Sequence, residues 1–184
     1  MNSIKVIYKY RLLIIVLLFF ISNNSKSQVS IKEFSKDLET YDFSDPNPIP
    51  IFISNPKIYP YFTFDGYNIE SKSKKFKIIE LENNYIKVLV TPELGGKVLG
   101  AIDKTSGEEF IYKNEVVKFR NISMRGPWTS GGIEFNFGII GHHPSTATPV
   151  DYKIRKNEDG SVSCFVGNID LPSRSQWRVE IIVK

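Results

Sequence analysis

Apolar and polar residues alternate from Phe76 onward, with turn residues between the runs. Residues 76–81 and 85–91 flank Glu82-Asn83-Asn84 and predict a β-hairpin. The same pattern predicts further strands at residues 97–103, 109–112, 149–156, 161–168 and 177–183. Outside the N-terminal segment, no window shows an apolar stripe with the helical repeat, so we expect an all-β domain of antiparallel strands.

The region before this pattern contains a proline-rich stretch. Residues 28–40 are polar and mixed in charge, and residues 41–62 hold five prolines interleaved with aromatic residues. Proline at that density excludes a helix or a central strand within 41–62, whereas the aromatic residues argue against a solvated linker. We therefore predict that residues 28–75 form an extended lead-in packed across the domain.

Residues 1–27 have the features of a signal peptide. Basic residues precede an uninterrupted apolar run at residues 12–21, and Ser25 and Ser27 suit a signal peptidase that cuts before Gln28. The apolar run is half of the roughly 20 residues that a membrane span needs. We expect a secreted or periplasmic protein with no stable membrane span after cleavage; a retained N-terminal anchor is the alternative.

Charge and cysteine content narrow the function classes. The chain carries 24 Lys and Arg against 20 Asp and Glu, but four of the basic residues lie in residues 1–27, so the remainder has no net charge. We therefore expect no binding to nucleic acid. Cys164 is the sole cysteine, which excludes an internal disulfide, and we expect it to be buried on a strand.

The C-terminal residues continue an apolar strand pattern. Residues 178–184 end the chain with no turn or polar tail after them. We therefore expect residues 76–184 to be the N-terminal part of a truncated β-sandwich domain.

Candidate chemistry gathers in residues 124–151, which contain both histidines. Imidazole suits proton transfer near neutral pH. Because His142 and His143 are adjacent, they face opposite ways on extended backbone, and at most one points into a given site. The alternative is that one histidine packs in the domain while the other is solvated.

Other side chains in this segment suit a sugar ligand. Glu134 stands among aromatic residues, where a carboxylate is either paired or readily protonated, and both states are typical of acid/base sites. The alternative is an edge-strand glutamate that reaches solvent. Arg125 and Trp128 flank a Gly-Pro turn, so that the indole could pack on a sugar ring while the guanidinium binds its hydroxyls. A core position is the alternative for Trp128.

Several other chemistries lack their signatures. The glycine pairs at 95–96 and 131–132 have no strand–helix context for a phosphate loop. There is no Cys pair or His-x-x-Glu-His spacing for a metal, and no nucleophile elbow for a Ser-His-Asp triad. We expect no metal and no cofactor.

Residues 81–152, and above all the motif RGPWTSGG-IE-N-GIIGH within them, resemble a bacterial domain family of unknown function. That family has the galactose-mutarotase-like (aldose 1-epimerase-like) fold and is often followed by tetratricopeptide repeats. The likeness runs from about Ile31 to the C-terminus. It implies a β-supersandwich of which this chain holds the first part, with a repeat region as a possible partner.

The resemblance also implies roles for single residues. In sugar epimerases of this fold a histidine protonates the ring oxygen and a distant glutamate removes the anomeric hydroxyl proton. His142 matches that histidine because it directly follows Gly141. Arg125 matches an arginine that could hold sugar hydroxyls, while Glu134 and Asn136 match the family's I-E-x-N pattern, for which no role is established. The partner glutamate of true mutarotases is missing from this chain.

These observations predict an exported carbohydrate-binding or carbohydrate-active domain. If catalytic, it would act at the anomeric centre of a sugar, as an aldose 1-epimerase-like isomerase or a glycoside hydrolase. The candidate catalytic residues are His142 and Glu134. The candidate sugar-binding residues are Arg125, Trp128, Asn136 and His143. The alternatives are a non-catalytic glycan-recognition or protein-interaction module, and an inactive truncated remnant.

Overall fold

The computed structural model describes residues 29–43, 68–121, 127–137, 144–170 and 174–184. The predicted signal peptide and the prolines of residues 46–60 lie outside the described residues. No helix among the residues described is long and apolar enough to cross a membrane.

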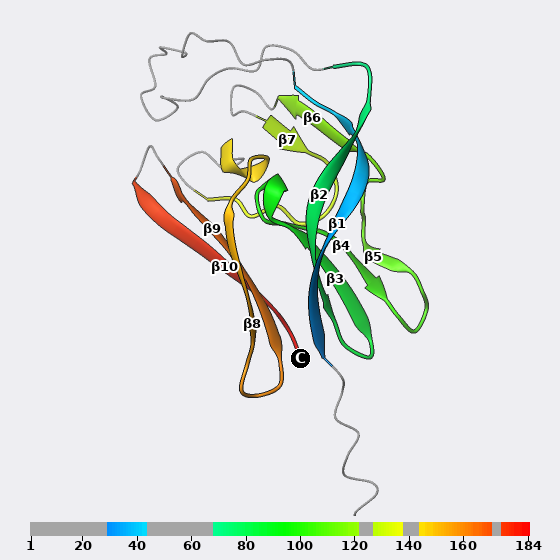
Figure 1. The fold of residues 1–184 in the computed structure, drawn as a ribbon, viewed down its shortest axis with the longest axis vertical. Helices are drawn as coiled ribbons and strands as arrows, with labels where there is room; N and C mark the ends of the chain where they lie inside the picture. Colours follow the sequence, from blue (N-terminus) through cyan, green and yellow to red (C-terminus); the bar gives the residue numbers. More distant parts are fainter. Residues whose placement is uncertain (1–28, 44–67, 122–126, 138–143, 171–173) are drawn as a thin grey trace, which may run out of the picture.

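Ten strands in the described part of the chain form two sheets (Figure 1). The strands are β1 (Ser30–Tyr41), β2 (Lys72–Glu82), β3 (Ile86–Thr91), β4 (Lys97–Asp103), β5 (Glu109–Ile111), β6 (Val117–Asn121), β7 (Pro127–Thr129), β8 (Asp151–Lys156), β9 (Val162–Asp170) and β10 (Ser175–Val183). One sheet has the order β5-β4-β3-β2-β1-β6-β7, and the other has the order β10-β9-β8. The prediction of an all-β sandwich is confirmed.

The predicted hairpins form as the turn residues indicate. Asn83 closes the β2–β3 turn, where its Oδ1 accepts hydrogen bonds from the backbone N–H groups of Tyr85 and Ile86, each at 2.8 Å. The β8–β9 turn is closed by Asn157, whose backbone N–H donates to the carbonyl of Ser161 at 2.8 Å. Short polar side chains stabilise such turns by bonding to nearby backbone groups.

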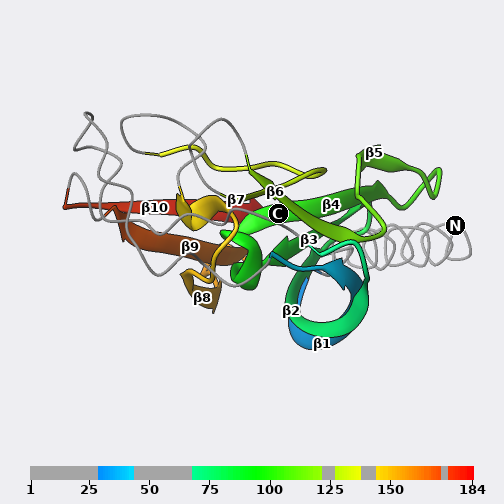
Figure 2. The ribbon, with the colours of Figure 1, turned by 90° about the horizontal axis from the view of Figure 1, so that it is seen from above.

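β1 is a strand that the alternation pattern did not reveal. It pairs antiparallel with β2 from Ser30 opposite Glu82 to Thr40 opposite Lys72, and it pairs parallel with β6 where Thr40 meets Val117. The first segment of the lead-in is therefore a central strand of the large sheet, curled together with β2 (Figure 2). Most of its side chains are exposed, which explains its polar sequence. The β1–β6 pair is also the one parallel contact between the described strands.

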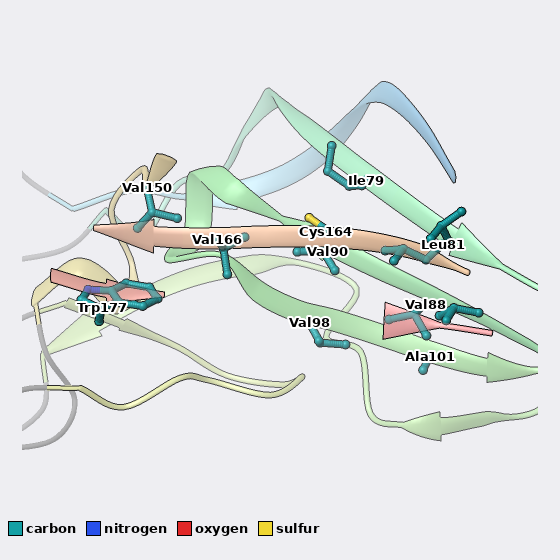
Figure 3. Packing of buried hydrophobic residues seen from close by; sticks show 12 residues of the cluster. Ile79, Leu81, Val88, Val90, Val98, Ala101, Val150, Cys164, Val166 and Trp177 are labelled. Carbon is teal, nitrogen blue, oxygen red and sulfur yellow. The ribbon is translucent and has the colours of Figure 1, made fainter. Parts of the chain in front are cut away.

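One apolar core lies between the two sheets (Figure 3). β9 contributes Val162, Cys164 and Val166, each at most 1% exposed, which face residues of the large sheet such as Ile79 and Val90. Burial raises the pKa of the Cys164 thiol to about 12. Cys164 is thus a buried strand residue, as the sequence predicts.

A second apolar cluster lies on the other face of the large sheet. The members of this second cluster are Leu38, Phe76, Ile78, Leu94, Leu99, Val117, Phe119 and Ala147. Ile78 and Ile79 are adjacent on β2 and both fully buried, although their side chains point to opposite faces. The large sheet is therefore covered on both faces, so that a side chain of β4 can be buried whichever face it points to.

A polar cluster also links the two sheets. Lys77 Nζ on β2 lies 2.6 Å from the Tyr152 hydroxyl on β8 and 2.9 Å from a Glu33 carboxylate oxygen on β1. The Tyr152 hydroxyl lies 3.0 Å from the other oxygen of Glu33. These contacts lower the pKa of Glu33, chiefly through the bond to Lys77, and raise the pKa of Lys77, chiefly through the bond to Tyr152.

Candidate functional site

The segment after β7 rests directly on β4. Val98 and Ile133 form an antiparallel β-bridge, in which the Ile133 N–H donates to the Val98 carbonyl at 2.8 Å and the Val98 N–H donates to the Ile133 carbonyl at 3.2 Å. This bridge fixes the register between the predicted Gly-Gly-Ile-Glu motif and the start of β4.

Gly131 and Gly132 make that close approach possible. Their φ angles are +77° and +71°, which lie in a backbone region that residues other than glycine rarely adopt. A Cβ on Gly132 would lie 2.0 Å from the Val98 carbonyl oxygen. The Gly132 N–H donates to the Tyr112 carbonyl at 2.7 Å, which anchors the turn. The glycine pair therefore serves a backbone contact.

Lys97, the first residue of β4, is a buried cation that sequence reasoning missed. Its side chain is 2% exposed, and its Nζ donates to the Thr129 carbonyl at 3.0 Å and to the Thr129 hydroxyl at 3.2 Å. Burial lowers its pKa from 10.5 to about 8, while the negative charge of Glu134 acts in the opposite direction. The available signal was a lysine between a glycine pair and an apolar run, Gly95-Gly96-Lys97-Val98-Leu99.

Glu134 lies across from Lys97. Because Val98 pairs with Ile133 in antiparallel register, the next pair outward is Lys97 with Glu134, and opposite residues of such a pair point to the same face. Lys97 is buried whereas Glu134 is partly exposed, and the negative charge of Glu134 acts on the Lys97 amine. The acid/base role expected for Glu134 stays a prediction.

The aromatic residues beside Glu134 belong to the core. Phe135 and Phe137 pack against the cluster between the sheets, and the Phe137 ring stacks on Trp177 with a centroid distance of 6.2 Å and an interplanar angle of 29°. Asn136, between them in sequence, is exposed. The segment therefore directs its aromatic residues inward and leaves Asn136 at the surface with the partly exposed Glu134.

Trp128 is half-buried on β7, next to the threonine that binds Lys97. β7 pairs with β6, where Thr129 lies opposite Phe119 of the second apolar cluster and Trp128 lies opposite Arg120. Since neighbouring strand residues point to opposite faces, Trp128 and Thr129 lie on different sides of β7. The structure thus brings Lys97, Thr129 and Glu134 together and places Trp128 on the opposite face of the same strand.

Three predicted site residues, Arg125, His142 and His143, lie outside the described residues. Their proposed roles remain predictions. The described residues include no group of three or more His, Cys, Asp and Glu side chains that could hold a metal ion.

Comparison with known proteins gives the family. The family model described as "Domain of unknown function (DUF5107)" matches residues 54–184, which is most of the chain. The chain belongs to the DUF5107 family. The matched region contains every candidate site residue of this DUF5107 chain, from Lys97 to His143. The predicted membership of a family of unknown function is therefore confirmed.

A solved structure resembles this DUF5107 chain over much of its length. It is the crystal structure of a TPR-domain containing protein from Parabacteroides distasonis, which is 30% identical with a TM-score of 0.68. The match covers 76% of this chain and 24% of that protein. The chain thus spans about a quarter of the length of this relative.

Proposed function

We propose that this chain is the carbohydrate-recognition part of an exported β-sandwich protein with a galactose-mutarotase-like fold. The observation that carries the proposal is the position of Glu134, which is partly exposed, lies opposite the buried Lys97 and stands two residues before the exposed Asn136. The confirmed β-sandwich architecture and the DUF5107 match agree with the motif resemblance on which the fold proposal rests.

The polar groups suit the hydroxyls of a sugar. A carboxylate accepts hydrogen bonds from hydroxyl groups, and an asparagine amide both donates and accepts them. Hydrogen bonds with a charged partner are stronger than neutral ones, so Glu134 would provide the main polar contact. Trp128 lies on the opposite face of β7, where its ring offers a second, separate surface on which the C–H face of a sugar residue could pack.

If the complete protein is catalytic, it acts at the anomeric centre. His142 then protonates the ring or glycosidic oxygen, as the resemblance implies, and Glu134 is proposed as a second carboxyl-type group. Arg125 and His143 hold sugar hydroxyls in this proposal. The tetratricopeptide-repeat relative supports an arrangement in which a repeat region follows the sandwich in the full-length protein.

Glycan-array binding by the full chain tests the proposal. We expect Trp128→Ala and Glu134→Gln each to weaken the strongest wild-type signals. Tyr85→Ala is the matched control, because Tyr85 is an aromatic residue with 64% of its surface exposed on the distant β2–β3 turn. Equal signals from the wild type, Trp128→Ala and Glu134→Gln, or no binding by the folded wild type, would contradict carbohydrate recognition at this site.

Export is tested separately. We propose that a signal peptidase cuts before Gln28 and releases the protein to the periplasm or the medium. Mass spectrometry of the protein recovered from those fractions should give a mature N-terminus at Gln28. Recovery of the uncut chain from the membrane would instead support the retained anchor.

A further inference from the structure

We propose that Lys97 is a positioning residue whose buried charge attracts the carboxylate of the opposite residue Glu134, so that Glu134 faces a ligand as a hydrogen-bond acceptor. The inference deepens the proposed function, since the ligand-facing role of Glu134 rests on carbohydrate recognition. The electrostatic interaction between Lys97 and Glu134 does not depend on the identity of the ligand.

Backbone geometry sets the two side chains opposite each other. The bridge between Val98 and Ile133 has both of its hydrogen bonds, so the register one step outward places Lys97 opposite Glu134. Gly132 approaches the Val98 carbonyl so closely that a Cβ at this position would lie 2.0 Å from the oxygen. Side chains opposite each other in an antiparallel pair have Cβ atoms about 5 Å apart.

The amine of Lys97 is fixed in place. It is 2% exposed, and two of its three donor hydrogens are accounted for by the carbonyl and the hydroxyl of Thr129. A buried ammonium is costly without a negative partner. Glu134 supplies that negative charge, which acts to keep Lys97 protonated against the effect of burial.

The two side chains differ in their exposure to solvent. Lys97 is buried and cannot contact a ligand at the surface, whereas Glu134 is partly exposed. A nearby buried cation attracts a carboxylate and favours the rotamers that keep the two charges close. Glu134 is thereby suited to accept a hydroxyl hydrogen bond from a ligand at the surface.

Titration of Lys97 by NMR tests the coupling. In the full chain labelled with ¹³C, the Cε signal of Lys97 is identified by its loss in Lys97→Arg and followed against pH. We expect its midpoint to lie near pH 8 in the wild type and to move to lower pH in Glu134→Gln. Glu158→Gln, an exposed charge in the β8–β9 turn, is the matched control and should leave the midpoint unchanged. An unchanged midpoint in Glu134→Gln would overturn the inference.

A double-mutant cycle tests the positioning role. Binding of D-glucose and D-galactose is measured for Lys97→Met, Glu134→Gln and the double variant. We expect Lys97→Met to weaken binding by about tenfold, Lys97→Arg to restore part of it, and the double variant to bind no worse than Glu134→Gln alone. Additive losses would show that Lys97 acts independently of Glu134 and would overturn the positioning role.

The two proposals fail separately. If the wild type binds no sugar but the Lys97 midpoint responds to Glu134→Gln, carbohydrate recognition is wrong and the Lys97–Glu134 coupling holds. If Lys97→Met does not fold, the titration of Lys97 still tests the coupling, because it uses Glu134→Gln. That variant changes a partly exposed side chain without changing its size, so we expect it to fold.

Discussion

Gly132 lies so close to Val98 that a Cβ atom on the glycine would be 2.0 Å from the valine carbonyl oxygen. The contact sets the register by which Lys97 and Glu134 face each other. The glycine is required here for two reasons, its positive φ of +71° and the approach of another backbone.

We expect Gly132→Ala to destabilise the domain by more than the same change at Gly107. Gly107 has a similar φ of +78° but no atom within 4 Å of the position of a Cβ, so Gly107→Ala costs only the left-handed backbone, about 1–2 kcal/mol. Gly132→Ala adds a clash with rigid backbone and should cost several kcal/mol. Urea unfolding of both variants measures the difference. Equal free energies of unfolding would show that the Gly132 segment moves away from β4 without cost.

The sequence predicted much of the fold because the alternation on β2, β3, β4 and β9 reports burial of one or both faces. It did not predict β1, since most side chains of that strand remain exposed while its backbone is paired on both sides. Alternation reveals buried faces and carries no information on backbone pairing. The sequence pattern also did not predict the short strands β6 and β7.

We expect the stability of the wild type to rise between about pH 8 and pH 10.5 relative to that of Lys97→Met. The pKa of Lys97 is about 8 in the folded chain and 10.5 as its ordinary value, so the unfolded chain binds more protons in that window. The gain should be about 3 kcal/mol at most. Chemical denaturation at closely spaced pH values measures it.

Cys164 acts in the opposite direction within the same range. Its pKa is raised to about 12, so the unfolded thiol ionises above its ordinary value of 9.0 while the folded thiol does not, and stability falls with pH. The comparison with Lys97→Met removes this contribution, because both proteins contain Cys164. Parallel stability curves for the two proteins would show that Lys97 is not desolvated in solution.

We expect the cluster of Glu33, Lys77 and Tyr152 to stabilise the contact between the sheets in a pH-dependent way. The pKa of Glu33 is lowered from its ordinary value of 4.5, so its contribution is present above that pH and is lost as the pH falls through the folded value. Glu33→Gln should therefore lose less stability than the wild type on acidification below pH 4.5. Acid titration followed by circular dichroism measures this. Identical acid transitions for Glu33→Gln and the wild type would contradict the prediction.

We expect Trp177→Phe to cost much less stability than Trp177→Ala. The Trp177 indole is 6% exposed, and its Nε1 makes no hydrogen bond with the described residues, so phenylalanine loses only part of the packing. Removing the ring should cost about 3–5 kcal/mol, since Trp177 stacks on Phe137 and fills the core between the sheets. Thermal unfolding of both variants measures the difference, and a large loss in Trp177→Phe would indicate that Nε1 is bonded in solution.

The candidate site was predictable only in part. The sequence indicates Glu134 by its place among aromatic residues, and the structure places it opposite the buried Lys97, although those aromatic residues belong to the core. The sequence does not indicate Lys97, because a lysine at the start of a strand is usually exposed. Its burial depends on β7, which meets β4 only through tertiary structure.

The central place of β1 has a consequence for the order of folding. β1 is the first described strand to leave the ribosome, but β2 follows only at Lys72 and the parallel partner of Thr40 is Val117. Long-range pairs of this kind form slowly, because a long loop must close before any contact is gained. A nascent chain therefore carries β1 unpaired until β2 is made, and one edge of β1 stays open until β6 follows at Val117. Until then, residues 30–41 expose backbone hydrogen-bonding groups that a chaperone could cover.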